Sequence, residues 1–146
     1  MTSKPILLVE DNPDDEELTL LALKDHKIAN DVVVTRDGVE ALDYMFATGK
    51  FAGRKPSELP ALILLDLKLP KLGGLDVLKR LREDSRTRVI PVVVLTSSNE
   101  EQDIVTSYQL GTNSFVRKPI DFHEFQKVVK EIGVYWLLVN QPPILK

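Results

Sequence analysis

Short runs of apolar residues alternate along this chain with segments in which apolar residues recur every three or four positions. The runs are continuous rather than alternating, which is typical of strands that are covered on both faces of a parallel sheet. They predict five strands, at Ile6–Val9, Val32–Val34, Ala61–Leu65, Val92–Leu95 and Ser114–Val116.

The segments between these runs predict helices, each with one buried stripe. Asn12-Pro13 marks the start of the first helix, and Asp121 with Glu124 resembles a capping box at the start of the last. The expected stripes are Leu18, Leu21 and Ala22; Val39, Leu42, Met45 and Phe46; Leu75, Leu78 and Leu81; Ile104, Val105 and Tyr108; and Phe125, Val128, Val129 and Ile132. Alternating strands and helices predict an α/β fold with a doubly wound, five-stranded parallel sheet.

Composition and charge exclude several classes of protein. The 146 residues, 43% of them hydrophobic, fit one domain over residues 1–146 with an apolar C-terminal extension at 135–146. A net charge of -3 gives no basic footprint for nucleic acid or a membrane surface. The absence of cysteine excludes disulfides, thiolate metal sites and a cysteine nucleophile. No apolar stretch approaches the roughly 18 residues of a membrane span, so we expect a cytoplasmic protein.

Polar residues with chemical potential follow four of the predicted strands. Glu10 and Asp11 end the first, Asp66 the third, Thr96 the fourth and Lys118 the fifth. Alone, Asp66 could simply cap the turn after its strand. The carboxyl ends of parallel strands meet at one edge of the sheet, however, and neighbouring first and third strands would bring three carboxylates into one crevice.

Such a cluster of acids predicts a metal site, because like charges raise one another's pKa unless a cation neutralises them. Mg²⁺, or Mn²⁺, takes oxygen ligands and keeps several waters. We expect Asp11 and Asp66 as carboxylate ligands, Glu10 as a direct or water-mediated ligand, and Lys68 through its backbone carbonyl. The acids at 14 and 15 are explained by the dipole of the first helix and are left outside the site.

Thr96 and Lys118 complete a set that suits a phosphoryl acceptor. A hydroxyl can donate to a phosphoryl oxygen, and an ammonium group can pair with the phosphoryl charge. Pro119 permits a cis peptide bond that would turn the amine of Lys118 inward.

Four motifs in order then give a resemblance to a known family. They are Val9-Glu10-Asp11-Asn12, Leu65-Asp66-Leu67-Lys68-Leu69-Pro70 with Gly73-Gly74, Leu95-Thr96-Ser97-Ser98, and Arg117-Lys118-Pro119. Together they resemble the receiver domains of two-component response regulators, over residues 5 to 135. The resemblance implies the strand order 2-1-3-4-5 of flavodoxin-like sheets. It also implies Asp66 as the phosphoacceptor, Glu10 and Asp11 in the metal site, and Thr96 and Lys118 as switch residues.

Phe115 matches the aromatic switch position of the family, although by itself it would be an ordinary core aromatic. The resemblance implies that a histidine kinase phosphorylates Asp66 with Mg²⁺, that Thr96 then moves toward the phosphoryl group, and that Phe115 rotates inward. The surface around the fourth helix, the fifth strand and the fifth helix would change. Such a domain is not an enzyme beyond its own phosphoryl transfer and dephosphorylation.

Three departures resemble the stand-alone regulators that work with phytochrome kinases. They are the long loop from Gly49 to Pro60, the Ser97-Ser98 pair and the aromatic tail. A phytochrome is therefore the expected kinase. Ser97 also lies near the expected path of an attacking water, which bears on the lifetime of the phosphorylated state.

No output module follows the last predicted helix, so we expect the signal to pass by protein–protein association or by phosphorelay. The tail Tyr135-Trp136-Leu137-Leu138-Val139 is unusually apolar for a chain end. One interpretation is a homodimer surface with Tyr135, Trp136 and Leu138, and the other is a tail folded over its own core.

Other function classes share parts of this pattern. A haloacid dehalogenase phosphatase would need a second aspartate where Lys68 stands, so its general acid is missing. A flavodoxin-like FMN carrier would need a phosphate-binding turn, yet the turn after the first strand is Asp11-Asn12-Pro13-Asp14. A pseudo-receiver would lack acids that are all present here. A phosphorelay intermediate and a non-signalling flavodoxin-like binding module remain as alternatives.

Overall fold

A five-stranded parallel sheet forms the centre of the computed structural model, which describes residues 4–25, 28 and 30–143. The last three residues of the predicted extension, 144–146, lie outside the described residues. The strand order is β2-β1-β3-β4-β5, as predicted. All five predicted strands are confirmed to within one residue at each end: β1 (Ile6–Val9), β2 (Val32–Thr35), β3 (Leu62–Leu65), β4 (Val92–Thr96) and β5 (Ser114–Arg117).

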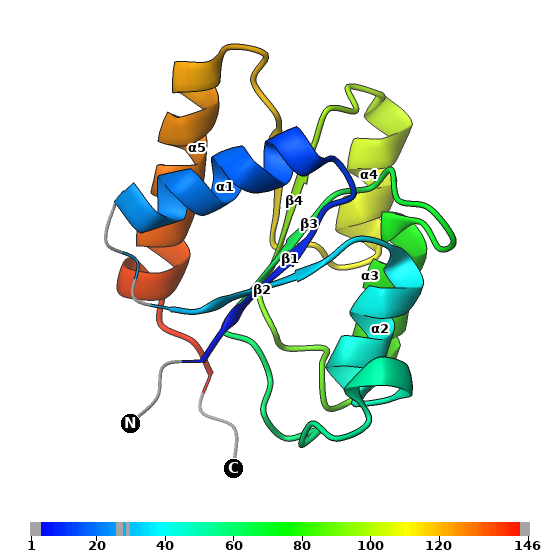
Figure 1. The fold of residues 1–146 in the computed structure, drawn as a ribbon. Helices are drawn as coiled ribbons and strands as arrows, with labels where there is room; N and C mark the ends of the chain where they lie inside the picture. Colours follow the sequence, from blue (N-terminus) through cyan, green and yellow to red (C-terminus); the bar gives the residue numbers. More distant parts are fainter. Residues whose placement is uncertain (1–3, 26–27, 29, 144–146) are drawn as a thin grey trace.

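Helices cover both faces of this sheet. The helices α1 and α5 lie side by side on one face, while α2, α3 and α4 lie on the other (Figure 1). Both predicted caps are present: the Asn12 side chain accepts from the amides of Asp14 and Asp15, and the Asp121 side chain accepts from the Glu124 amide at 3.0 Å. The helices are α1 (Pro13–Asp25), α2 (Gly38–Phe46), α3 (Gly74–Glu83), α4 (Glu101–Gln109), α5 (Phe122–Val134) and a π-helical turn, η2 (Tyr135–Val139).

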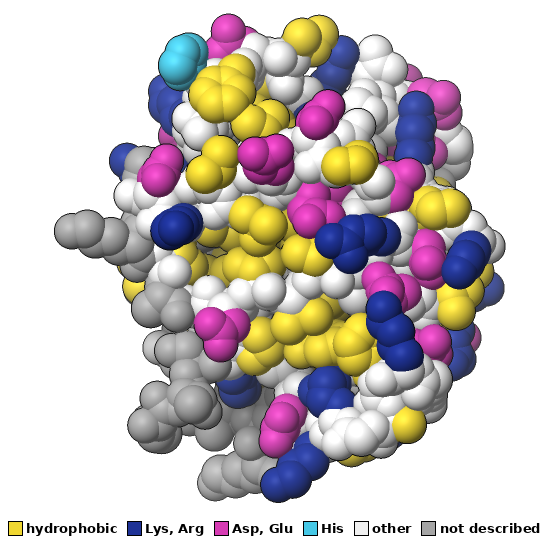
Figure 2. Space-filling model, viewed as in Figure 1, with side chains coloured by type: hydrophobic (Ala, Val, Ile, Leu, Met, Phe, Trp, Pro, Cys, Tyr) yellow, Lys and Arg dark blue, Asp and Glu magenta, His cyan; other side chains and the backbone are white. Residues whose placement is uncertain are grey.

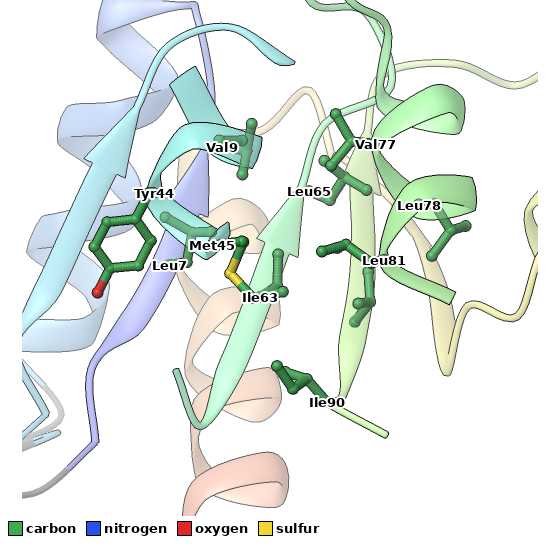
Figure 3. Packing of buried hydrophobic residues seen from close by; sticks show 12 residues of the cluster. Leu7, Val9, Tyr44, Met45, Ile63, Leu65, Val77, Leu78, Leu81 and Ile90 are labelled. Atoms are coloured by element: carbon green, nitrogen blue, oxygen red, sulfur yellow. The ribbon is translucent and has the colours of Figure 1, made fainter. Parts of the chain in front are cut away.

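The buried apolar residues form two clusters, one on each side of the sheet. Odd-numbered residues of β1 and β3, such as Leu7 and Ile63, pack with Met45 of α2 and Leu81 of α3 (Figure 3). Even-numbered residues of the same strands pack against α1 and α5. Both faces of the sheet are therefore covered by helices, which explains why the strand sequences are continuously apolar.

Four members of the predicted helical stripes are exposed, so the prediction is wrong for them. Leu21, Val39, Val105 and Tyr108 have exposed fractions of 41%, 44%, 48% and 53%. In α4 the buried side chain is that of Ser107, whose hydroxyl donates to the carbonyl of Asp103 at 2.7 Å. This helix turns a small polar residue inward and leaves Val105 and Tyr108 at the surface, while Ile104 is half-buried.

The loop from Gly49 to Pro60 is anchored at the amino edge of the sheet. It opens with a short 3₁₀ helix, η1 (Gly49–Phe51). The guanidinium of Arg54 stacks on the ring of Tyr44 at 4.1 Å and donates to the carbonyls of Tyr44 and Glu58. Three backbone carbonyls, counting that of Lys55, accept from this side chain, which leaves the arginine with a structural role.

The surface carries acidic and basic side chains interspersed on the face seen in Figure 2, without a field of one sign. Among the residues that the structure describes, no helix has both the length and the apolar character needed to cross a membrane.

Candidate functional site

The carboxyl ends of β1 and β3 bring three acids together. Beyond the strands, the sheet bonds continue: the amide of Glu10 donates to Thr35 and the amide of Asp66 donates to Val9, at 3.0 and 3.1 Å. The first bond joins β1 to β2, and the second holds the ends of β1 and β3 side by side. As a result, one oxygen from each of Glu10, Asp11 and Asp66 lies within 4.8 Å of the others.

Lys118 reaches this cluster from the end of β5. Its amide donates to the carbonyl of Thr96 at 2.7 Å, which places it at the same edge of the sheet. Its Nζ donates to Glu10 Oε1 at 2.6 Å, to Asp66 Oδ2 at 2.7 Å and to Asp15 Oδ2 at 2.8 Å. An ammonium group has three donors, so every donor of this buried lysine is used.

The members of the cluster differ in how burial and neighbouring charges shift their pKa values. Burial raises the pKa of Glu10 to about 7, although Lys118 opposes the shift. Burial also acts to raise the pKa of Asp66, but the hydrogen bond and charge of Lys118 outweigh it and lower that pKa. Burial acts to lower the pKa of Lys118, and its three carboxylate partners raise it instead. Asp66 is therefore held as an anion beside a fixed positive charge.

Thr96 lies fully buried at the end of β4 and connects the site to α4. Its hydroxyl contributes to lowering the pKa of Asp66, and its Oγ1 accepts from the amide of Ser98 at 3.3 Å. The hydroxyl of Ser98 donates in turn to Asp103 Oδ2 at 2.5 Å, in the first turn of α4. A change at Thr96 is thus two hydrogen bonds away from that helix. Ser97, by contrast, is exposed.

The loop after β3 holds the second oxygen of Asp66. The amide of Lys68 donates to Asp66 Oδ1 at 3.2 Å, while the lysine side chain is exposed. Gly74 opens α3 directly against this loop: a Cβ there would lie 2.3 Å from the Asp66 carbonyl oxygen. Only glycine allows the helix to approach so closely, which explains Gly74 in physical terms; at Gly73 the nearest atom to an added Cβ is 3.8 Å away.

β5 and the turn after it carry the predicted aromatic switch residue, whose rotation stays a prediction, and the predicted cis bond. Phe115 is half-buried on β5, in register with Val94 of β4. The Lys118–Pro119 peptide bond is trans, so the predicted cis bond is wrong. The inward direction of the lysine follows instead from the backbone bond to Thr96 and from its three carboxylate partners.

Asp15 belongs to the cluster, contrary to the sequence interpretation that left it outside. It lies in the first turn of α1, four residues after Asp11, which precedes the helix. The helix dipole by itself favours an acid at this position, so the sequence carries no separate signal of the contact with Lys118. Asp14 is exposed, as that explanation requires.

The residues present fit a divalent cation. The ammonium group of Lys118 binds three carboxyl groups, from Glu10, Asp15 and Asp66, and Asp11 lies beside two of them, so the acids outnumber the one positive charge. Three of them converge their oxygens on one point, and oxygen is the donor that Mg²⁺ and Mn²⁺ prefer.

The tail splits into an inward and an outward side. Trp136 and Leu137 pack against the core cluster under α5, whereas Tyr135, Leu138 and Val139 are exposed. Of the three residues predicted for a dimer surface, Trp136 is thus the one that packs on its own chain.

Comparisons with known proteins agree with this geometry. Residues 6–130 match the family described as the response regulator receiver domain. The probable methanogenesis regulatory protein FilR2 of Methanothrix harundinacea is 40% identical over 94% of this chain and 86% of its own. Response regulator Rcp1 of Synechocystis is 38% identical over 92% of this chain and 89% of its own.

Solved structures support the same conclusion. The phosphorylated cyanobacterial phytochrome response regulator RcpA superposes with a TM-score of 0.91 at 39% identity, over 98% of this chain and all of its own. The Mn²⁺-bound form of Rcp1 superposes with a TM-score of 0.90 at 36% identity, over 97% of this chain and 99% of its own.

Proposed function

The chain belongs to the response regulator receiver family of two-component signalling, whose members are phosphorylated by histidine kinases, and we propose that Asp66 is its phosphoacceptor. The observation that carries this proposal is the ion pair between Asp66 and the buried ammonium of Lys118, beside two further carboxylates. At one point, Asp66 supplies a nucleophilic anion, Lys118 supplies a positive charge for the product, and the neighbouring acids offer a place for a divalent cation.

The reaction follows from these groups. A carboxylate oxygen of Asp66 attacks the phosphorus of a phosphohistidine, the bond between phosphorus and the imidazole nitrogen breaks, and an acyl phosphate forms. Lys118 pairs with the phosphoryl charge, and Thr96 donates its hydroxyl to a phosphoryl oxygen. The structure of a phosphorylated relative, RcpA, supports this assignment.

The acidic cluster fits the divalent-metal binding of receiver domains, and we propose that it holds Mg²⁺ through Glu10, Asp11 and Asp66 with the backbone carbonyl of Lys68. When bound, such an ion offsets the charge that gathers between the acceptor and the phosphoryl group. Glu10 and Asp66 are buried, so their oxygens keep fixed positions before the ion arrives.

The domain transmits its state rather than acting as a conventional enzyme, and we propose that it catalyses only its own phosphoryl transfer and dephosphorylation. Movement of Thr96 toward the phosphoryl group would break its bond to the amide of Ser98 and disturb the contact between Ser98 and Asp103. The start of α4 is therefore the first surface to respond. Inward rotation of the half-buried Phe115 would follow.

The test of the central proposal compares the parent with Asp66→Asn. After incubation with acetyl phosphate and Mg²⁺, the intact mass of the parent should increase by one phosphoryl group, and that of the variant should not. Chelation of Mg²⁺ should abolish the gain in the parent. A phosphorylated variant, or an unmodified parent, would contradict the assignment of Asp66.

A phytochrome is the proposed kinase, supported by the similarity over the full chain to the phytochrome response regulator RcpA. A phosphorylated phytochrome kinase should transfer its phosphoryl group to this protein faster than an unrelated phosphorylated histidine kinase does at equal concentration. Equal rates from both kinases would argue against this partner.

We also propose a homodimer that involves the outward side of the tail. Leu138 and Val139 have exposed fractions of 73% and 64%, and both follow directly on α5. Truncation would confuse the test, because Trp136 and Leu137 pack on the core. The sharper variant is Leu138→Ser with Val139→Ser, and Val39→Ser, at a single exposed valine of α2, is the control. In sedimentation, the tail variant should be a monomer and the control a dimer; a monomeric parent would refute the proposal.

A further inference from the structure

Asp15 is the one carboxylate partner of Lys118 that stands outside the convergent acids. The oxygens of Glu10, Asp11 and Asp66 gather within 4.8 Å of one another, and those of Asp15 are not among them. The Asp15 side chain is 26% exposed, whereas those of Glu10 and Asp66 are 3% and 8% exposed. It therefore holds the lysine from the rim of the site.

The backbone of Asp15 is fixed, so this contact is built into the fold. Its amide donates to the side chain of Asn12 at 3.1 Å, and its carbonyl accepts from the hydroxyl of Thr19 at 2.7 Å. These bonds tie the first turn of α1 on both sides of the residue. The carboxylate consequently faces the lysine in a set position.

The use of all three lysine donors creates a competition. A phosphoryl oxygen can bind Lys118 only if one of the three carboxylates gives up its donor. A divalent ion would offset the charges of Glu10 and Asp66, which lie in the convergent set. The charge of Asp15 would remain directed at the ammonium group, and its exposed position would let water replace the lost contact.

We propose, building on Asp66 as the phosphoacceptor, that Asp15 is a positioning residue that competes with the phosphoryl group for the Lys118 ammonium. It acts through Lys118 and limits how strongly the site holds an anion. The same competition slows phosphorylation of Asp66 by small donors, because the lysine must first turn from one anion to the other.

The test uses Asp15→Asn, which keeps an acceptor oxygen but removes the charge. Asp14→Asn is the matched control: it removes the same charge from the same helical turn, where the side chain is exposed. At saturating Mg²⁺, Asp15→Asn should bind beryllium fluoride about tenfold more tightly than the parent, the size expected for removal of one nearby like charge. The control should stay within about twofold of the parent, as a screened surface charge does. Titration calorimetry measures both.

A second measurement separates a positioning role from simple repulsion. In a Lys118→Met background, the gain from Asp15→Asn should largely disappear, because the lysine through which it acts is absent. Persistence of the full gain would show direct repulsion and overturn the proposal, as would equal or weaker binding by Asp15→Asn in the parent background. Failure of the phosphoacceptor proposal would look different: the parent itself would gain no phosphoryl group.

Discussion

Lys118 and Ile120 stand two residues apart after β5 and break the usual rule of burial in opposite ways. The lysine is buried with a full charge, whereas the side chain of Ile120 is completely exposed. The lysine ends at a cluster of acids on one edge of the sheet. Three further apolar side chains are about half exposed on α4 and at the start of α5, those of Val105, Tyr108 and Phe122, and with Ile120 they are here called the second region.

The two kinds of exception to the burial rule are stabilised by different means. The buried charge persists because each of its donors has a partner, so that its removal would leave carboxylates uncompensated. The exposed apolar side chains are not held by comparable ion pairs. Substituting them should change the free energy of unfolding little. Exceptions to the burial rule tend to mark functional positions, so the first region suggests chemistry and the second suggests contact with other molecules.

The largest effect on stability is expected from Lys118→Met, which removes the buried charge among the acids. With a chelator present, we expect the free energy of unfolding to fall by about 3 to 5 kcal/mol, the cost of leaving buried charges without their partner. Added Mg²⁺ should recover part of the loss, since a ligand bound only to the folded state stabilises it. Urea denaturation with and without Mg²⁺ measures both. A variant as stable as the parent in chelator would contradict the account of the buried cluster.

A pH series sharpens the role of Glu10. Its pKa is raised by burial from 4.5 to about 7 in the folded state, so the folded protein holds this proton more tightly than the unfolded chain. Stability from this group is complete below pH 4.5 and is lost as the pH rises toward 7. The loss is on the order of 3 kcal/mol at 1.36 kcal/mol for each unit of pKa.

In the chelated protein, Glu10→Gln should remove this dependence between pH 4.5 and 7. Unfolding curves across that range measure the difference from the parent, with Glu17→Gln, a change on the exposed side of α1, as the control. Parallel pH profiles for the parent and Glu10→Gln would show that Glu10 is not the group responsible.

The smallest effect is expected in the second region. Ile120→Ser should change the free energy of unfolding by less than about 0.5 kcal/mol, as for surface substitutions without special contacts. Val129→Ser, at a fully buried position of α5, supplies the contrast and should cost several kcal/mol. A loss above about 1 kcal/mol from Ile120→Ser would mean that this side chain is packed in solution, and the comparison would fail.

The strands could be predicted from the sequence, because strands covered on both faces have short continuous runs of apolar residues, which few other elements have. The sequence predicted the helices less well. The residues Val105 and Tyr108 have helical spacing, yet their exposure depends on how α4 lies against its neighbours. That arrangement is a tertiary property, and a short helix with few large apolar residues carries little information about it.

Within the site, the acids at the ends of β1 and β3 could be predicted because parallel strands share an edge. Asp15 could not, since its partner Lys118 is 103 residues away and the helix dipole already explained an acid there. The cis bond was wrong for a similar reason: Pro119 permits it, but the backbone bond from Lys118 to Thr96 already directs the lysine.

The loop anchored by Arg54 has a practical consequence. It lies at the edge of the sheet opposite the acids, and a Cβ added at Gly53 would meet nothing within 4 Å. Because the chain contains no cysteine, Gly53→Cys would create a unique thiol for a fluorescent or spin label. The architecture thus offers a labelling position from which the behaviour of the whole domain can be followed without touching its reactive end.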